Sequence, residues 1–137
     1  MRFFLLFLLS TIMILSCKEQ KTATAPDLQN AENAPAFNTD IDIPTAKNMI
    51  AQSPKIVLLD VRTPEEIALG KIGDAVEIDI TSPDFNEKVA ALDKSKEYIV
   101  YCAAGGRSAK AVHMMKELGF DKTYNLKAGY TGWAKAQ

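Results

Sequence analysis

Beyond residue 41 the sequence alternates between two kinds of hydrophobic pattern, and this alternation limits which folds the chain can adopt. The segments KIVLLDV (55–61) and EYIVYC (97–102) are short runs of β-branched, aliphatic and aromatic residues, as is typical of strands buried on both faces. Segments of helix length, with apolar residues at helical spacing, lie between such runs. Because parallel strands need long crossover connections, the pattern predicts an α/β fold with a mostly parallel central sheet flanked by helices on both faces.

Helical spacing and helix-start signals predict four helices, which lie within residues 41–53, 63–70, 82–93 and 108–120. Two further strands are predicted at 75–80 and 123–126. In parallel sheets, ligands bind at the carboxyl ends of the strands, close to a helix N-terminus. Asp60 and Cys102 each come at the end of a buried-type strand, so we expect both at this edge of the sheet.

The first 16 residues have the layout of a secretory signal peptide, with one early arginine, an apolar run over residues 3–15 and a small residue before Cys17. The apolar run is too short to span a bilayer comfortably as a helix. Its end, ILSC, resembles the lipobox of bacterial lipoproteins, in which the cysteine is lipidated and becomes the first mature residue. We therefore expect a signal peptide at 1–16 and a lipid on Cys17. Simple secretion and an uncleaved anchor are the alternatives.

Residues 17–40 hold almost no large apolar side chains and show no periodicity, which predicts a flexible tether between lipidated Cys17 and one domain at 41–137. The expected location is the bacterial cell envelope, with the lipid-anchored chain facing the periplasm or the cell exterior. The lipid is the expected membrane contact. With 16 basic against 17 acidic residues, the charge gives no reason to expect nucleic acid or an anionic membrane surface as a partner.

The chain has only two cysteines, so neither a disulfide framework nor a cysteine-based zinc site is expected. If Cys17 carries lipid, Cys102 is the one free thiol of a protein exported to an oxidising compartment. A lone thiol in that compartment needs either burial or a function.

Cys102 is followed by a loop of very small residues that ends in a positive charge. The loop comprises Ala103, Ala104, Gly105, Gly106 and Arg107, and Ser108 begins the next predicted helix. Small side chains let backbone N–H groups turn inward as a nest around an anion, and the helix N-terminus adds the positive end of its dipole. We therefore expect the pKa of Cys102 to fall below its ordinary value of about 8.5, which leaves a thiolate at neutral pH without a histidine base.

Two other interpretations of this segment remain open. A cysteine at a strand end can be a buried structural residue. Tyrosine phosphatases carry C-x5-R followed by Ser or Thr, with the arginine clamping two phosphate oxygens, whereas the spacing here is C-x4-R. A ring of N–H groups that is one residue shorter suits a single sulfur atom better than a tetrahedral phosphate.

Three motifs occur in an order that resembles the single-domain rhodaneses, which are sulfurtransferases: LLDVRTPEE (58–66), YIVYCAAGGRSAKA (98–111) and NLKAGYTGW (125–133). The resemblance covers roughly residues 41–137. The six-residue catalytic loop of that family corresponds to CAAGGR, from Cys102 to Arg107. The resemblance implies a rhodanese-like fold in which Cys102 is the catalytic residue.

In the mechanism that the resemblance implies, the Cys102 thiolate takes the outer sulfur of a small donor such as thiosulfate. The resulting persulfide passes this sulfur to a thiol or cyanide acceptor. N–H groups of residues 103–108 would stabilise the negatively polarised sulfur, and Arg107 would attract the anionic donor. Beyond the covalent persulfide, no cofactor or metal is expected, and the resemblance names no protein partner.

Asp60 and Arg62 are expected to support the site, because the pattern DVR suggests that they brace the sheet edge through hydrogen bonds or a salt bridge. Two further functions remain open. One is a rhodanese-fold sulfur carrier or protein-binding module with little free turnover. The other is the chemistry of a cysteine phosphatase or an arsenate reductase.

Overall fold

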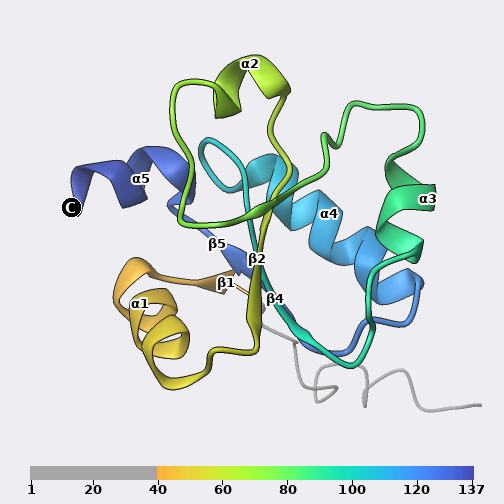
Figure 1. Ribbon diagram of the computed structural model, residues 1–137, viewed down its shortest axis with the longest axis horizontal. Coiled ribbons are helices and arrows are strands. Elements are labelled where there is room, and N and C mark those ends of the chain that lie inside the picture. The colour runs from red at the N-terminus through yellow and green to blue at the C-terminus, as the bar shows by residue number, and fades with distance from the viewer. Residues whose placement is uncertain (1–39) are drawn as a thin grey trace, which may run out of the picture. The chain divides into compact units, whose positions relative to one another are not determined.

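The computed structural model describes residues 40–137, which fold around one five-stranded sheet (Figure 1). The strands are β1 (Asp40–Ile41), β2 (Ile56–Asp60), β3 (Val76–Glu77), β4 (Glu97–Tyr101) and β5 (Thr123–Leu126). Their spatial order is β1-β5-β4-β2-β3, and every neighbouring pair is parallel. The prediction of an α/β fold with a parallel central sheet is therefore confirmed.

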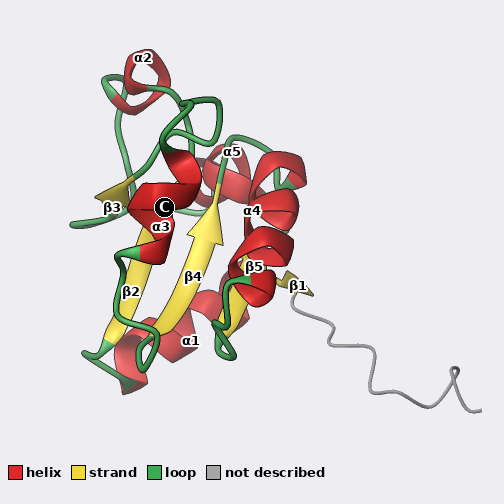
Figure 2. Cartoon of the chain, turned by 90° about the vertical axis from the view of Figure 1, so that its right-hand side faces the viewer, coloured by secondary structure: helices red, strands yellow, loops and turns green. Residues whose placement is uncertain are grey.

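Five helices connect these strands or follow the last of them: α1 (Ile43–Gln52), α2 (Pro64–Ile67), α3 (Phe85–Ala90), α4 (Gly106–Glu117) and α5 (Gly129–Lys135). Helices α1 and α5 cover one face of the sheet, and α3 and α4 cover the other (Figures 1 and 2). The short helix α2 lies beyond the carboxyl ends of the central strands. No helix within residues 40–137 is both long and apolar enough to cross a membrane.

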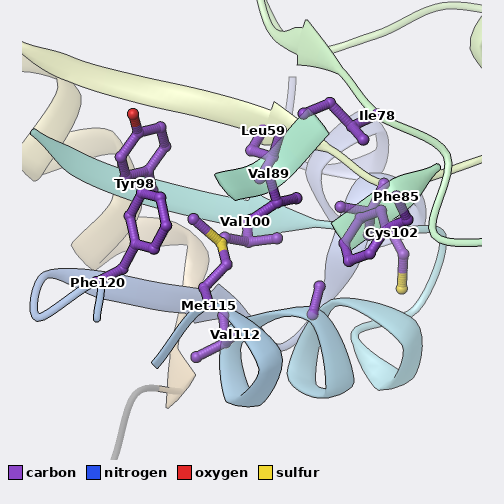
Figure 3. Close-up of a cluster of buried hydrophobic side chains, with 12 residues drawn as sticks. Leu59, Ile78, Phe85, Val89, Tyr98, Val100, Cys102, Val112, Met115 and Phe120 are labelled. Carbon is purple, nitrogen blue, oxygen red and sulfur yellow. The ribbon is translucent and has the colours of Figure 1, made fainter. Parts of the chain in front are cut away.

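Strand β4 shows how the sheet divides the core between its two faces. Tyr98, Val100 and Cys102 belong to the buried cluster that packs against α3 and α4. Ile99 and Tyr101 belong to the cluster on the α1 and α5 face. This division follows from the two-residue period of a strand. Figure 3 shows Cys102 at one end of the first cluster and Tyr98 at the other, so the cysteine lies at the carboxyl edge of the sheet.

Three elements differ from their predictions. The predicted strand 75–80 is regular only over Val76–Glu77, although the N–H groups of Ile78 and Ile80 still bond to the carbonyl oxygens of Asp60 and Val61. Strand β1 was not predicted, since two residues carry no detectable periodicity. It begins at Asp40, the last residue of the predicted tether, which pairs with Asn125. Helix α5 was not predicted either.

The interpretations of the N-terminal region lie outside the described residues. They are the signal peptide at 1–16, the lipid on Cys17 and the tether up to residue 39.

Candidate active site

Cys102 directly follows β4, and its side chain is buried, with 2% of its surface exposed. Its Sγ accepts a hydrogen bond from the backbone N–H of Gly105 at 3.2 Å. The Ser108 hydroxyl oxygen lies 3.5 Å from the same sulfur. The loop therefore curls back so that the N–H of Gly105 and the hydroxyl group of Ser108 both lie against one sulfur atom.

The first turn of α5 holds this loop in shape from outside. The carbonyl oxygen of Cys102 accepts the N–H of Tyr130 at 2.7 Å, and that of Ala103 accepts the N–H of Thr131 at 3.0 Å. These carbonyl groups therefore point outward, to α5, and the N–H of Gly105 points inward, to the sulfur of Cys102. Gly129 makes the approach possible, since a Cβ there would lie 2.5 Å from the Ala103 oxygen.

Gly105 supplies the sharp turn that the loop needs. Its φ of +89° lies in the left-handed region, which glycine adopts at little cost. A Cβ at this position would also collide with the backbone carbonyl of Lys127, next to α5. The predicted need for small residues in the loop therefore has a specific physical basis at Gly105.

Opposing effects act on the Cys102 thiol. Burial raises the pKa of Cys102, whereas hydrogen bonds from the Ser108 hydroxyl and from the N–H groups of Ser108, Ala104 and Gly105 lower it. The hydrogen bonds outweigh burial, so the pKa lies below its ordinary value. This direction is the one that the sequence predicted for a nucleophilic cysteine.

Arg107 does not stand free at the mouth of the loop. Its two terminal nitrogens donate to the two carboxylate oxygens of Glu66, at 2.8 and 2.6 Å. Arg107 holds the pKa of Glu66 at about 2, although the smaller effect of burial acts the other way. The positive charge that was expected to attract an anionic donor is thus largely compensated by a carboxylate from α2.

Asp60 and Arg62 form a buried ion pair at the end of β2. The Arg62 Nε donates to Asp60 Oδ1 at 2.9 Å, and Nη2 donates to Oδ2 at 2.6 Å. Arg62 also donates to the carbonyl oxygens of Gly70 at 2.8 Å and Glu66 at 3.3 Å. The arginine therefore ties α2 and the turn after it to the sheet edge.

A second polar chain leads from the cysteine into the sheet. The Ser108 hydroxyl donates to Asn125 Oδ1 at 2.6 Å. The Asn125 Nδ2 donates in turn to the Asp40 carboxylate at 2.8 Å. Ser108 and Asn125 are both buried, with 0% and 2% of their surface exposed.

Of the predicted loop residues, the structure places Ala104, Gly105, Arg107 and Ser108 against the sulfur of Cys102. Asp60 and Arg62 lie at the end of the neighbouring strand β2. Helix α4 begins at Gly106, two residues before the predicted start, so the last loop residues already form its first turn. His113 is exposed on α4, 3.4 Å from Glu117 and away from the sulfur's partners. It is not placed to act as a base for Cys102.

Sequence reasoning missed three residues of the site. Glu66 lay within the motif LLDVRTPEE without a role of its own, and besides pairing with Arg107 it caps α2 by accepting from the Thr63 N–H. Asn125 and Gly129 lay within a quoted motif, but no role was assigned to them. The available signal was the position of Asn125, a polar residue next to the apolar Leu126 at the end of a strand. A buried amide at such a position needs hydrogen-bond partners.

Comparison with known proteins agrees with this geometry. The family described as Rhodanese-like domain matches residues 42–136, and the chain belongs to that family. A sulfurtransferase of Allochromatium vinosum is 29% identical over 96 residues, covering 70% of this chain and 88% of that protein. The Bacillus subtilis protein YtwF is 38% identical over 94 residues, covering 69% of this chain and 88% of the relative.

Among solved structures, a rhodanese-like domain protein from Staphylococcus aureus superposes with a TM-score of 0.62 at 31% identity. The match covers 69% of this chain and 89% of that protein. These relatives support sulfurtransferase activity in general.

Proposed function

We propose that this protein is a sulfurtransferase that carries sulfane sulfur as a persulfide on Cys102. The observation that carries the proposal is the set of polar groups around one sulfur: the Gly105 N–H donates to it at 3.2 Å, and the Ser108 hydroxyl, whose hydrogen Asn125 shares, lies 3.5 Å away. Such fixed donors stabilise negative charge on sulfur as an oxyanion hole stabilises it on oxygen. Family membership and the name of the Allochromatium relative point in the same direction.

In the first half-reaction, the Cys102 thiolate attacks the outer sulfur of a donor such as thiosulfate. A new S–S bond forms, and the S–S bond of the donor breaks with its electron pair leaving on sulfite. The negative charge of the thiolate becomes the charge of the persulfide, so charge and electrons balance. The lowered pKa of Cys102 favours the attacking thiolate form.

In the second half-reaction, an acceptor attacks the outer sulfur of the persulfide. With cyanide, a C–S bond forms, the S–S bond breaks, and the products are thiocyanate and the original thiolate. With a thiol acceptor, the thiolate form attacks and becomes a persulfide itself. Loop donors that held the thiolate before the cycle hold it again at the end.

The test measures sulfur loading on the full-length chain. The chain is treated with thiosulfate and digested, and the mass of the tryptic peptide 97–107 is compared with that of a Cys102→Ser variant. We expect the wild-type peptide alone to gain one sulfur atom, and cyanide to remove it with formation of thiocyanate. Loading of the Cys102→Ser chain at another residue would overturn the assignment of Cys102.

A second candidate function is supported by the burial of Cys102 and the pairing of Arg107. A site with a recessed sulfur and little free positive charge suits a carrier that receives sulfur from a partner and turns over slowly with free anions. Steady-state turnover with excess thiosulfate and cyanide separates the two functions. Rapid turnover supports the enzyme, whereas loading without turnover supports the carrier. Hydrolysis of an aryl phosphate that vanadate inhibits would point instead to phosphatase chemistry.

For the N-terminal region we propose lipidation at Cys17, which would hold the domain at a bacterial membrane. The layout of residues 1–17 supports this proposal. Expression of the full-length chain and of a Cys17→Ala variant in a bacterium, followed by fractionation, tests it. We expect only the wild type to carry acyl mass on Cys17. An N-terminus without acyl mass in the wild type would contradict it.

A further inference from the structure

The polar chain that begins at Cys102 ends at the first described residue of the domain. Ser108, on α4, lies 3.5 Å from the sulfur and donates to Asn125 on β5. Asn125 donates to Asp40, which stands 85 positions earlier in the sequence, on the edge strand β1. None of these three residues needs to touch a substrate to influence the sulfur.

The direction of every hydrogen bond in this chain is fixed by one group. A carboxylate only accepts hydrogen bonds, so the Asp40 oxygen requires the NH₂ side of the Asn125 amide to face it. The amide oxygen of Asn125 must then face Ser108, and it accepts the Ser108 hydroxyl at 2.6 Å. The opposite orientation of the amide would place its oxygen against the carboxylate.

A hydroxyl group has only one hydrogen to donate. Three acceptors surround the Ser108 hydroxyl: Asn125 Oδ1 at 2.6 Å, the Gly105 carbonyl oxygen at 3.1 Å and Cys102 Sγ at 3.5 Å. The shortest contact belongs to Asn125. The hydrogen that would stabilise a thiolate is therefore shared with, and drawn toward, the amide.

We propose that Asp40 is a positioning residue that acts through Asn125: it fixes the direction of the Ser108 hydroxyl hydrogen and so limits how strongly Ser108 stabilises the Cys102 thiolate. The inference rests on the proposed function only in taking Cys102 as the reacting group. Asp40 is linked to the loop through Asn125 and Ser108.

Other charges face the sulfur and have to be separated from this effect. Arg107, on α4, favours the thiolate, and Glu66, on α2, offsets its charge through the ion pair at 2.6 Å. The Asp60–Arg62 pair lies at the end of the neighbouring strand β2. These four groups are not altered in Asp40→Ala. Asp42 and Lys127 line the same surface cavity as Asp40, so their charges have to be tested separately from the polar chain.

The experiment follows the rate of iodoacetamide alkylation of Cys102 against pH in the full-length chain, by mass spectrometry of the peptide 97–107. In Asp40→Ala the Asn125 amide is free to turn its NH₂ toward Ser108. The serine hydrogen is then released to the sulfur. We expect the midpoint of the profile to move to lower pH, with about a fivefold rise in thiolate fraction below the midpoint, the effect of one net hydrogen bond. The rate plateau at high pH should fall, because a less basic thiolate is a weaker nucleophile.

A simple loosening of the domain would give the opposite result, since exposing Cys102 moves its midpoint up toward that of an ordinary thiol. Asp42→Ala is the matched control. It removes a carboxylate two residues away and the bond from Thr45 N–H that caps α1, but it leaves the polar chain intact. We expect the profile of Asp42→Ala to match that of the wild type.

Removal of the Asp40 charge could also act on the sulfur directly through space. The double variant Asp40→Ala, Ser108→Ala separates the two explanations. If the chain transmits the effect, Asp40→Ala causes no further change once Ser108 is replaced. An equal change in both backgrounds, or no change in the wild-type background, overturns the proposal. Because alkylation needs no sulfur donor, a failure of sulfur transfer would not produce either outcome.

Discussion

The ends of β2 and β4 lie side by side in the sheet, with Asp60 paired to Tyr101, but their polar groups have different partners. At the end of β2, the Asp60 carboxylate is fully engaged by the backbone N–H and the guanidinium of Arg62. At the end of β4, the sulfur of Cys102 faces N–H and hydroxyl donors, and the nearby Arg107 shares its charge between the sulfur and Glu66. At the end of β2 the polar groups pair with one another, whereas at the end of β4 they face the sulfur of Cys102.

The two strand ends are also connected through Tyr130 of α5. The Arg62 guanidinium lies 4.1 Å from the centre of the Tyr130 ring. The Tyr130 N–H donates to the carbonyl oxygen of Cys102 at 2.7 Å. The closed ion pair thus supports the first turn of α5, which in turn holds the loop. The internally paired end of β2 therefore supports the donor loop around the buried sulfur at the end of β4.

The largest effect is expected from breaking the Asp60–Arg62 ion pair at the end of β2. Asp60→Ala leaves the Arg62 charge buried without its carboxylate, with only 3% of that side chain exposed. We expect the free energy of unfolding, measured by urea denaturation, to fall by about 3–5 kcal/mol. Replacing both partners by apolar residues, in Asp60→Leu, Arg62→Met, should cost clearly less. An equally large loss in the double variant would show that the pair is not the cause.

A medium effect breaks the contact between α5 and the loop. Gly129 has a φ of +57°, and a Cβ would lie 2.5 Å from the Ala103 oxygen. We expect Gly129→Ala to lower the free energy of unfolding by about 1–3 kcal/mol and to reduce sulfur loading of Cys102 as the loop shifts. Gly119→Ala is the control, since its φ of +87° carries similar strain with no backbone nearby. It should lose stability but load sulfur normally.

The smallest effect is expected from breaking the Arg107–Glu66 ion pair beside the end of β4. Glu66→Gln removes the charge that compensates Arg107, in a pair whose side chains are 35% and 34% exposed. Solvent screening limits the loss of stability to about 1 kcal/mol or less. We also expect KM for thiosulfate to fall by up to about fivefold, because the freed arginine attracts the anionic donor. A KM that stays the same would show that Arg107 does not bind the donor.

The same variant has a defined pH dependence. The pKa of Glu66 is lowered from 4.5 to about 2, so the folded state favours the carboxylate. The stabilisation from this group is fully present above about pH 4.5 and is lost as the pH falls toward 2. The difference in stability between wild type and Glu66→Gln should therefore shrink over that range in acid denaturation. A constant difference down to pH 2 would contradict the ion pair.

Residues 40–137 show which parts of the fold local sequence patterns can predict. Strands β2 and β4 were predicted because each is an uninterrupted run of five residues between turn signals. Strand β1 has two residues and exists only through its pairing with β5. Helix α5 contains glycines at positions 129 and 132, which disfavour helix, and its contacts with the loop compensate for that cost.

The site follows the same rule. Cys102 and its loop are contiguous, so spacing and residue size were sufficient to find them. The Arg107–Glu66 pair joins residues 41 positions apart, and Asn125 joins partners 17 and 85 positions away. Such contacts leave no local pattern. Only the folded sheet, which brings five parallel strands to one edge, reveals them.

The burial of the Cys102 sulfur has a consequence for how the protein selects what it reacts with. The empty thiol is 2% exposed, so bulky reagents and large thiols reach it poorly. A bound sulfane sulfur extends the side chain by one S–S bond, about 2 Å, and carries the reactive atom away from the β4 backbone. A bulky maleimide should then label the loaded protein faster than the empty one. This difference in reach would shield the empty thiol from bulky thiols and disulfides and favour contact with large partners only when Cys102 carries a sulfane sulfur.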